Sequence, residues 1–371
     1  MVLAYTELID SFTTTPASTW NNYDISTLKG VPKGAIVEIA LCNAQTGTEQ
    51  TMGVRTDGSA LNRSILIHEA EGGGEVVYTM PVKVHATTGL IECYTTATGN
   101  YFRILGYFTG CDFTEAYSSF DSTAALSWLD LDLGTANNLV HSVLTTHNIQ
   151  DTTYGYGIRM KGSTLTRYIS HHEPEAGGSS GFMWYVKSNS SDVIQYFSSN
   201  TAVDIIDLGY FDSTVDFVEA WSQKDVAASI TWTDFDLTAE MDVDGRIANF
   251  YIGNKNLDNE YNVGVRTDGS GLNRYILIHE SEGVGLNENN GYTVSVATGV
   301  ANGVVELYTG LNTAGYFWFA GYFKPVGAGP TPGWNKLQYL TEPPTAGAFN
   351  KIAYETEPPV SAAWNKIKYT P

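Results

Sequence analysis

The chain has 371 residues and a formal net charge of −20, because 40 aspartates and glutamates outnumber 20 lysines and arginines. Nucleic acids and anionic membranes are bound through lysine and arginine, so this acidic balance argues against both kinds of partner. Only 16% of residues are charged and 12% are aromatic, while glycine and tyrosine occur 37 and 23 times, a composition typical of turn-rich β-structure.

The N-terminal segment carries no recognisable targeting signal. Its first residues, MVLAYTELIDSFTTTPAST, contain no basic stretch and no continuous apolar run. No run of about 18 apolar residues occurs anywhere in the chain, so the sequence predicts no membrane insertion. We therefore expect the protein to remain in the compartment where it is made.

Short runs of β-branched and aromatic residues, separated by glycine-rich breakers, fill the first hundred residues. We expect strands at 35–41, 64–67, 76–84, 90–94 and 101–108. No stretch longer than about ten residues carries the periodicity of an amphipathic helix. Seven or eight short strands in roughly a hundred residues predict an antiparallel β-sandwich or jelly roll.

A central motif of this first unit recurs twice along the chain. Residues 53–74, GVRTDGSALNRSILIHEAEGGG, and 264–285, GVRTDGSGLNRYILIHESEGVG, are identical at 18 of 22 positions. A more divergent copy occupies 157–178. Each copy follows a Trp that stands four residues before an Asp, and each precedes a Gly-Tyr-Phe sequence. The repetition therefore extends beyond the motif to a whole unit.

The spacing of the copies indicates duplicated domains. Arg55, Arg159 and Arg266 are separated by 104 and 107 residues, which is too long for a solenoid repeat but matches an independently folding domain. We therefore expect three tandem antiparallel sandwiches, at 1–111, 112–215 and 216–326. The first and third should resemble each other most closely. The sequence leaves open whether they surround a quasi-threefold point or form an extended rod.

Each copy also repeats an arginine, a histidine and a glutamate. The candidate residues are Arg63, His68 and Glu69; Arg167, His172 and Glu173; and Arg274, His279 and Glu280. Arg63 shares its strand parity with Ile65 and Ile67, so we expect it on an apolar face, where it needs a carboxylate from another strand. We interpret the arginines and histidines as structural ion-pair residues. An acid–base or ligand site present three times is the alternative.

The remaining motifs give no positive reason to expect an enzyme. Adjacent strand residues such as His171 and His172 point to opposite faces and cannot chelate one metal together. The segment from Asp242 to Gly245 resembles the start of a calcium loop, but its glycine is misplaced and Gly253 stands where a glutamate is required. Three cysteines without CxxC spacing predict neither a disulfide framework nor a zinc site. We expect no cofactor, no metal and no catalytic residues.

After residue 326 a Pro/Gly-rich linker leads into a second, smaller repeat. The tail at 327–371 contains three copies of an aromatic-Asn-Lys motif with a 15-residue period, separated by Glu-Pro-Pro. The predicted docking residues are Trp334, Tyr339, Phe349, Tyr354, Trp364 and Tyr369. Fifteen residues bury too little apolar surface to fold alone. We therefore expect these aromatic residues to dock on partner subunits, with a disordered tail as the alternative.

In its architecture the chain resembles virion structural proteins of tailed viruses of bacteria or archaea. The shared features are tandem sandwiches, an acidic surface rich in Tyr, Thr and Gly, and a repeated docking tail. Capsid decoration proteins, head fibres and tail accessory proteins are of this type. The resemblance implies a non-enzymatic protein that assembles in the host cytoplasm with other virion proteins or symmetry-related copies. Two alternatives stay open: a secreted or surface glycan-binding adhesin, and a sandwich-domain hydrolase with two carboxylates in a cleft.

Overall fold

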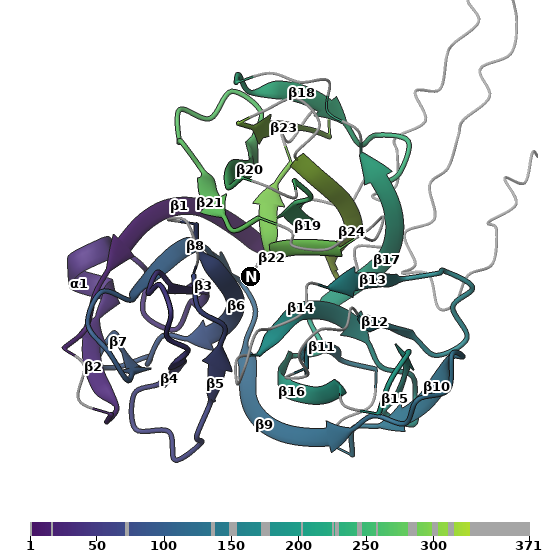
Figure 1. Ribbon diagram of the computed structural model, residues 1–371, viewed down its shortest axis with the longest axis horizontal. Helices are drawn as coiled ribbons and strands as arrows, with labels where there is room; N and C mark the ends of the chain where they lie inside the picture. The colour runs from purple at the N-terminus through teal and green to yellow at the C-terminus, as the bar shows by residue number, and fades with distance from the viewer. Residues whose placement is uncertain are drawn as a thin grey trace, which may run out of the picture. The chain divides into compact units, whose positions relative to one another are not determined.

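The protein is almost entirely β-structure, which confirms the predicted fold class. The computed structural model describes residues 2–326 except 16–17, 71–73, 135–137, 148–153, 172–178, 202, 225, 227–229, 243–246, 257–258, 281–287, 299–302 and 311–314. Within these residues, 24 strands and one five-residue helix form three antiparallel sandwiches (Figure 1). The described sandwiches belong to one unit that spans residues 1–331.

Sandwich 1 consists of two four-stranded sheets. Its central sheet has the order β1-β8-β3-β6, formed by Ala4–Phe12, Tyr101–Thr109, Ile36–Asn43 and Val76–Lys83. Its peripheral sheet has the order β2-β7-β4-β5, formed by Asn21–Asp24, Leu90–Thr95, Gln50–Thr56 and Ser64–Ile67. Helix α1, Ile25–Lys29, follows β2.

Sandwich 2 repeats this arrangement. Its central sheet has the order β9-β16-β11-β14, formed by Phe113–Asp121, Val203–Phe211, Val140–His147 and Ser180–Lys187. Its peripheral sheet has the order β10-β15-β12-β13, formed by Leu129–Asp132, Val193–Ser198, Tyr154–Met160 and Tyr168–His171.

Sandwich 3 has the same strand orders. Its central sheet is β17-β24-β19-β22, formed by Val215–Lys224, Gly315–Pro325, Ile247–Asn254 and Glu288–Ala297. Its peripheral sheet is β18-β23-β20-β21, formed by Thr233–Asp236, Val304–Thr309, Tyr261–Thr267 and Tyr275–Ile278. Strand β13 of sandwich 2 pairs in parallel with β22, so these two sheets are continuous.

Backbone contacts also join sandwich 1 to its two neighbours. The backbone N–H of His68, after β5, donates to the carbonyl of Ser179, just before β14. On the other side, Glu75 and Ile278 form a parallel bridge between the start of β6 and the end of β21. Together with the β13–β22 pairing, these contacts make three similar junctions that run from sandwich 1 to 2, from 2 to 3, and from 3 back to 1.

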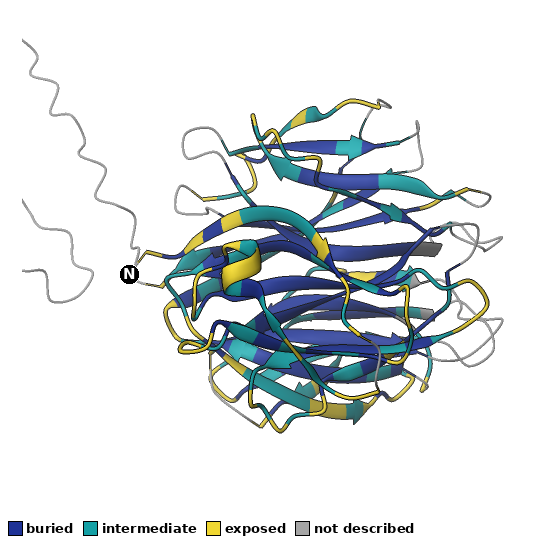
Figure 2. Ribbon diagram, turned by 90° about the vertical axis from the view of Figure 1, so that its left-hand side faces the viewer, coloured by how far each residue is buried: buried dark blue, intermediate teal, exposed yellow. Residues whose placement is uncertain are grey.

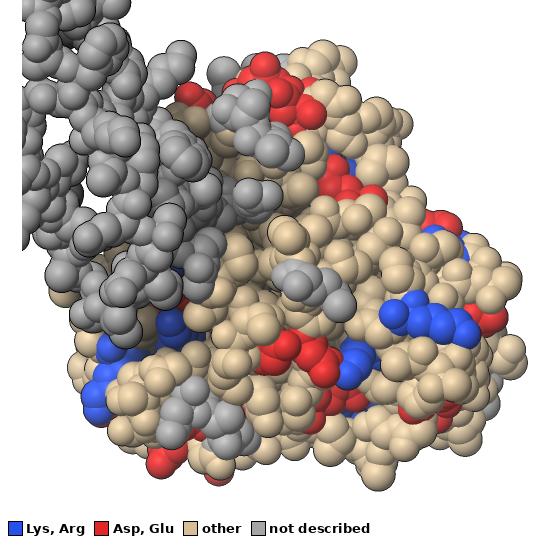
Figure 3. Space-filling view, turned by 180° about the vertical axis from the view of Figure 1, so that it is seen from behind, with Lys and Arg blue, Asp and Glu red and all other residues tan. Residues whose placement is uncertain are grey.

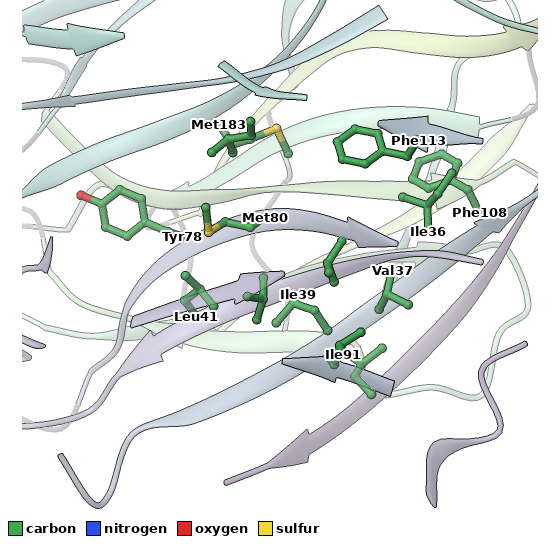
Figure 4. Packing of buried hydrophobic residues seen from close by; sticks show 14 of the residues in the cluster. Ile36, Val37, Ile39, Leu41, Tyr78, Met80, Ile91, Phe108, Phe113 and Met183 are labelled. Atoms are coloured by element: carbon green, nitrogen blue, oxygen red, sulfur yellow. The ribbon is translucent and has the colours of Figure 1, made fainter. Parts of the chain in front are cut away.

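The apolar core extends across the sandwich boundaries. Buried side chains follow the strands of all three sandwiches, while exposed residues concentrate in the loops (Figure 2). One cluster of buried residues includes members from every sandwich, among them Ile39, Met183 and Phe217. Figure 4 shows Phe113 of sandwich 2 beside Phe108 of sandwich 1, and Met183 of sandwich 2 belongs to the same cluster. The three sandwiches therefore share buried apolar surface.

One feature of the fold differs from the expectations drawn from the sequence. Helix α1 was not expected, yet Asp24 accepts from the Thr27 backbone N–H at its start and Gly30 adopts a left-handed conformation at its end. Strand β5 covers the predicted residues Ser64–Ile67, and Arg63 and Glu69 lie just outside it. No described helix is long and apolar enough to cross a membrane.

Candidate functional site

The strongest constellation of charged residues lies between the sandwiches. Arg63, which immediately precedes β5, is fully buried. Its Nη1 lies 2.9 Å from Oε1 of Glu115 on β9 of sandwich 2. Its Nη2 donates to the carbonyls of Pro81 at 2.9 Å and of Leu208 at 3.0 Å. One guanidinium therefore binds a carboxylate and a backbone carbonyl of sandwich 2, and it also binds a backbone carbonyl of its own sandwich, that of Pro81.

Arg167 makes the equivalent contacts from sandwich 2 to sandwich 3. Its Nη1 lies 3.2 Å from Oε1 of Glu219 on β17, and its Nη2 donates to the carbonyl of Ala320 on β24 at 3.1 Å. Tyr185 on β14 supplies the carbonyl that Pro81 supplies to Arg63. The divergent second copy has therefore kept the whole contact.

Arg274 completes the circuit from sandwich 3 back to sandwich 1. Its Nη1 lies 3.2 Å from Oε1 of Glu7 on β1, and its Nη2 donates to the carbonyl of Leu105 on β8 at 2.6 Å. Its Nη2 also donates to the Tyr5 hydroxyl at 2.9 Å. We call the pairs Arg63–Glu115, Arg167–Glu219 and Arg274–Glu7 the arginine clamps. Because each joins one sandwich to the next, they close a ring of pseudo-threefold symmetry.

Each clamp glutamate also accepts a backbone N–H from the sandwich that supplies the arginine. The donors are Thr56 to Glu115 at 3.0 Å, Met160 to Glu219 at 2.6 Å and Thr267 to Glu7 at 2.8 Å. These donors follow the Arg of the Gly-Val-Arg or Gly-Ile-Arg sequence in each repeat. The repeated motif therefore supplies both the arginine and a backbone donor to the same neighbouring glutamate.

Burial dominates the electrostatics of the clamps. Desolvation lowers the pKa of Arg63 and of Arg167, although Glu115 and Glu219 act in the opposite direction. Burial likewise raises the pKa of Glu219 against the attraction of Arg167. Around Arg274 the desolvation is outweighed by Tyr5, Glu7 and Glu38, so its pKa is raised. Each charge therefore depends on its partner, because water cannot reach it.

The phenylalanines of the three Gly-Tyr-Phe sequences meet where the sandwiches converge. The ring centroids of Phe108 and Phe211 lie 5.3 Å apart, those of Phe108 and Phe323 5.1 Å, and those of Phe211 and Phe323 5.6 Å. We call them the phenylalanine triad. Since each ring contacts the other two, the triad forms a layer of the core to which every sandwich contributes one residue.

A buried glutamate joins the three sandwiches beside this triad. Glu38 on β3 is fully buried. It accepts from the Tyr5 hydroxyl at 2.6 Å, the Tyr185 hydroxyl at 2.8 Å and the Ser295 hydroxyl at 2.7 Å, which belong to sandwiches 1, 2 and 3. Burial, followed by Glu38, raises the pKa of both tyrosines, which keeps their hydroxyls protonated as donors. The repeats have Ser142 and Asn249 at the position of Glu38.

Threonines continue these contacts along β6, β14 and β22. The Thr79 hydroxyl donates to the Thr293 carbonyl at 2.6 Å, and the Thr293 hydroxyl donates to the carbonyl of Met183. These three residues occupy equivalent positions in the three strands. Met183 has no hydroxyl, so the third bond of the series is not formed. The ring is therefore symmetric in backbone and only partly symmetric in side chains.

A second repeated constellation lies on the peripheral sheets. The guanidiniums of Arg55, Arg159 and Arg266 lie 4.2, 4.1 and 4.2 Å from the ring centroids of Trp20, Trp128 and Trp232. Arg55 and Arg266 pair with Glu92 and Glu306, while Arg159 bonds Gln195. The next aromatic residue in each sheet is Tyr94, Phe197 or Tyr308, whose ring lies against the Trp. We call these groups the peripheral aromatic stacks.

The predicted histidines contribute differently from the arginines. His68 and His279 are buried, and the His279 Nδ1 lies 2.8 Å from the carbonyl of Glu280. His172 and Glu173 lie outside the described residues. A buried histidine that the sequence did not single out is His141, whose ring nitrogens lie 3.2 Å from Asp192 and 3.4 Å from Asp207. It replaces the apolar Val37 and Ala248 of the other sandwiches.

The remaining candidate sites are a metal centre, the calcium-like segment and one surface hollow. Among the residues that the structure describes, no three His, Cys, Asp or Glu side chains gather closely enough to hold a metal ion. Asp242 lies 2.9 Å from Lys324, and the rest of the predicted calcium-like segment is outside the described range. An open hollow of about 400 Å³ is lined by Ser11, Phe12, Thr13, Tyr101 and Arg103. Arg103 itself pairs with Glu75.

The surface carries charges of both signs. Figure 3 shows acidic and basic side chains spread over one face among a larger number of uncharged residues. The six tail residues predicted to dock, Trp334, Tyr339, Phe349, Tyr354, Trp364 and Tyr369, lie outside the described residues.

Comparisons with known proteins give only distant likenesses. No protein-family model and no curated protein matches the chain. A chain from the structure of Sulfolobus turreted icosahedral virus is similar with 10% identity and a TM-score of 0.21, over 87% of this chain and 91% of that one. A chain from an archaeal virus structure described by its triple jelly roll fold and turret assembly has 10% identity and a TM-score of 0.18, over 87% and 90%.

A bacterial protein shows a similar degree of likeness. The tandem CBM22 domains of Paenibacillus barcinonensis Xyn10C have 10% identity and a TM-score of 0.16, over 57% of this chain and 93% of that one. TM-scores this low do not establish a common fold or a common activity.

Proposed function

We propose that the chain is a non-enzymatic structural subunit of a virus particle. The observation that carries the proposal is the closed circuit of arginine clamps. Three fused sandwiches joined in this way form one body that presents three similar faces around a pseudo-threefold axis. Symmetric particles contain positions on threefold or quasi-threefold axes, and a body with three similar faces about one axis can occupy such a position.

The tail supports an assembly role from the sequence side. Three aromatic anchors at a 15-residue period suit repeated docking, since a few buried aromatic residues dominate most interfaces. Three weak sites on one tether also raise avidity through effective concentration. We propose that the partners are other virion proteins or symmetry-related copies. The protein would then act as a decoration, fibre or tail accessory subunit, assembled in the host cytoplasm.

Deletion of residues 327–371 tests this function. Because the described sandwiches belong to a unit that ends at residue 331, the truncated protein should keep the melting behaviour of the parent. It should no longer co-sediment with purified particles, whereas the full chain should. If the truncated protein is incorporated as well as the parent, the tail is not the assembly element.

The peripheral aromatic stacks favour one second candidate, a glycan-binding adhesin. In sandwiches 2 and 3 a further ring, Tyr168 or Tyr275, stacks on Phe197 or Tyr308, with centroids 4.8 and 4.9 Å apart. Tyr168 is 40% exposed, and Arg159 and Gln195 lie on the same sheet. Partly exposed rings beside planar polar groups suit the apolar faces and hydroxyls of sugars.

Sandwich 1 supplies the matched control for this alternative, because it has Ser64 where the others have tyrosine. A Tyr168→Ser/Tyr275→Ser variant therefore carries a residue that the fold already accepts. On an array of immobilised glycans, an adhesin should lose at least tenfold in affinity for its best glycan. Absence of glycan binding by the parent, or equal binding by the variant, would count against the alternative.

A further inference from the structure

The peripheral sheet of each sandwich ends on a short strand that stands at the edge of the sheet. Strands β2, β10 and β18 are each four residues long and stand last in their sheets. In the part of the chain that the structure describes, no strand pairs with their outer sides. The backbone N–H and C=O groups on such an edge can accept an additional strand.

These three edge strands share one alternation of side chains. On one face lie a partly exposed tryptophan and exposed carboxylates, as in Trp128, Asp130 and Asp132 or Trp232, Asp234 and Asp236. The equivalent row in sandwich 1 is Trp20, Asn22 and Asp24. On the opposite face, Leu129, Leu131, Phe235 and Tyr23 pack against the sandwich cores. The edges at β10 and β18 are therefore acidic and aromatic on one face and apolar on the other, while the edge at β2 has the same alternation with one carboxylate, Asp24, which caps helix α1.

The tail repeats carry the complementary alternation. In an extended segment alternate side chains point to opposite faces. Trp334 and Lys336 would then share one face, and Leu337 and Tyr339 would share the other. The second and third copies repeat this with Phe349, Lys351, Ile352 and Tyr354, and with Trp364, Lys366, Ile367 and Tyr369. Each repeat is thus basic and aromatic on one face and apolar on the other.

We propose that the tail repeats of one copy add as extra strands to the outer edges of β2, β10 and β18 in a second copy. The added strand would place its lysine beside an edge aspartate and continue the apolar face with its Leu or Ile and its Tyr. Main-chain hydrogen bonds supply affinity in this mode, and side-chain alternation supplies register. This inference rests on the proposed function and names the surface that the tail recognises.

The number and the spacing of the repeats favour a second copy as the host. Three repeats match three equivalent edges, and each edge lies at the periphery of a different sandwich (Figure 1). Nine residues separate the end of one hexapeptide from the start of the next, so successive repeats can pair with edges that lie up to about 30 Å apart. Charge also agrees within the hexapeptides: they contain four lysines and no acidic residue, while the three glutamates of the tail lie in the spacers and the chain as a whole is strongly acidic.

Charge exchange in the full-length chain tests the proposal. One variant carries Asp130→Lys and Asp234→Lys, and another carries Lys336→Glu, Lys351→Glu and Lys366→Glu. Asp130 pairs with Lys161 in an exposed ion pair, so its loss costs the fold little. Sedimentation velocity over a concentration series should show self-association weakened at least tenfold in each variant. The combined variant should recover to within about threefold of the parent, because its charges are again complementary.

Asp112→Lys is the matched control. It makes the same charge change at an exposed residue just before β9 of a central sheet, where Asp112, like Asp130, forms an exposed ion pair with a lysine, Lys83. We expect it to associate like the parent, and all variants should keep the circular dichroism spectrum of the parent. If the control weakens association as much as the edge variant, net charge and not the edge is responsible, and the proposal fails.

The outcomes separate this inference from the proposed function. If truncation at residue 326 leaves self-association unchanged, the assembly role of the tail falls, and the edge proposal falls with it. If truncation abolishes association while the edge variant and the parent behave alike, the tail acts in assembly but binds elsewhere. If the full chain is monomeric at every concentration, docking on a second copy is overturned.

Discussion

Removing one partner of a buried ion pair costs more stability than the intact pair contributes. At the clamp formed by Arg63 and Glu115 both side chains are almost completely removed from solvent. Removing both charges costs little when apolar groups replace them, whereas removing one leaves the other without water or partner. Single substitutions at the clamps therefore measure how completely the junction between two sandwiches excludes solvent.

We expect Arg63→Ala to lower the free energy of unfolding by about 3–5 kcal/mol, because Glu115 loses its buried partner. Arg55→Ala is the control, since its pair with Glu92 is partly exposed, and it should cost about 1 kcal/mol. Urea unfolding of the two variants provides the measurement. Equal losses would mean that the clamp is no more buried in solution than the surface pair.

A pair of carboxylates across β9 and β16 should make stability depend on pH. Burial, followed by Asp121 directly opposite, raises the pKa of Asp204 above its ordinary value of 3.8. A carboxyl whose pKa is raised by folding lowers stability once the pH exceeds that pKa, and the cost is absent below the unfolded pKa.

Asp121→Asn should therefore stabilise the protein by a few tenths of a kcal/mol at pH 7. The gain should disappear as the pH falls below the ordinary value of 3.8 towards about 3, where Asp204 is protonated in both the folded and the unfolded state. Urea midpoints of parent and variant at the two pH values give the comparison. A gain that persists at the lower pH would show that the effect is not electrostatic.

The sequence alone indicated that the repeated arginines need carboxylate partners, but it did not identify them. Glu7, Glu115 and Glu219 each stand thirteen residues before the tryptophan of their repeat, so the repetition contained a signal for them. The repetition did not reveal their role, because each glutamate pairs with an arginine of the preceding sandwich in the ring and not with one of its own sandwich. Such a contact is invisible in the pattern of any single unit.

At the level of elements, the strands with strong apolar alternation were predictable and the weaker ones were not. The predicted strand 64–67 coincides with β5, while β2 and helix α1 were missed. Helix α1 is five residues long, too short for helical periodicity to appear, although Asp24 and Gly30 are ordinary capping residues. Caps therefore carried more information than periodicity at this site.

The bulge in β16 requires glycine for two reasons. Gly209 has φ +128°, and a Cβ there would lie 2.2 Å from the carbonyl oxygen of Thr114 on β9. Gly162 also has a positive φ, of +86°, but a Cβ there would meet nothing within 4 Å. At Gly162 only the backbone conformation favours glycine, whereas at Gly209 the close approach of β9 adds a second reason.

We expect Gly162→Ala to cost about 1 kcal/mol, the conformational term alone. Gly209→Ala should cost at least about 2 kcal/mol more, because β9 must also move away. Thermal melts of the two variants against the parent would show the difference. Equal losses would indicate that β9 yields to the added methyl group without resistance.

On the scale of the whole molecule, contacts between sandwiches make the three repeats interdependent. The phenylalanine triad, Glu38 and the arginine clamps each require residues from more than one sandwich. Sequence repetition predicted three units but left their arrangement open. The arrangement depends on contacts between side chains of different units that lie far apart in the sequence, so local pattern could not predict it.

This interdependence predicts cooperative unfolding. Although the body contains three sandwiches, we expect scanning calorimetry to show one transition whose calorimetric and van't Hoff enthalpies agree. Independent sandwiches would instead give a ratio near three. Glu38→Ala should lower the single transition temperature without splitting it, since the residue bonds all three sandwiches. A split transition in the parent would contradict this expectation.

The clamp between Arg274 and Glu7 links residues 267 positions apart, and Ser295 binds Glu38 over 257 positions. A ribosome that makes the chain from its N-terminus exposes Glu7, Tyr5 and Glu38 long before their partners exist. During that interval, sandwich 1 holds acidic and apolar surface that its own residues cannot cover. The third sandwich therefore completes the first, and any chain released before sandwich 3 has been made presents an open, acidic junction for which that missing sandwich is the fitting partner.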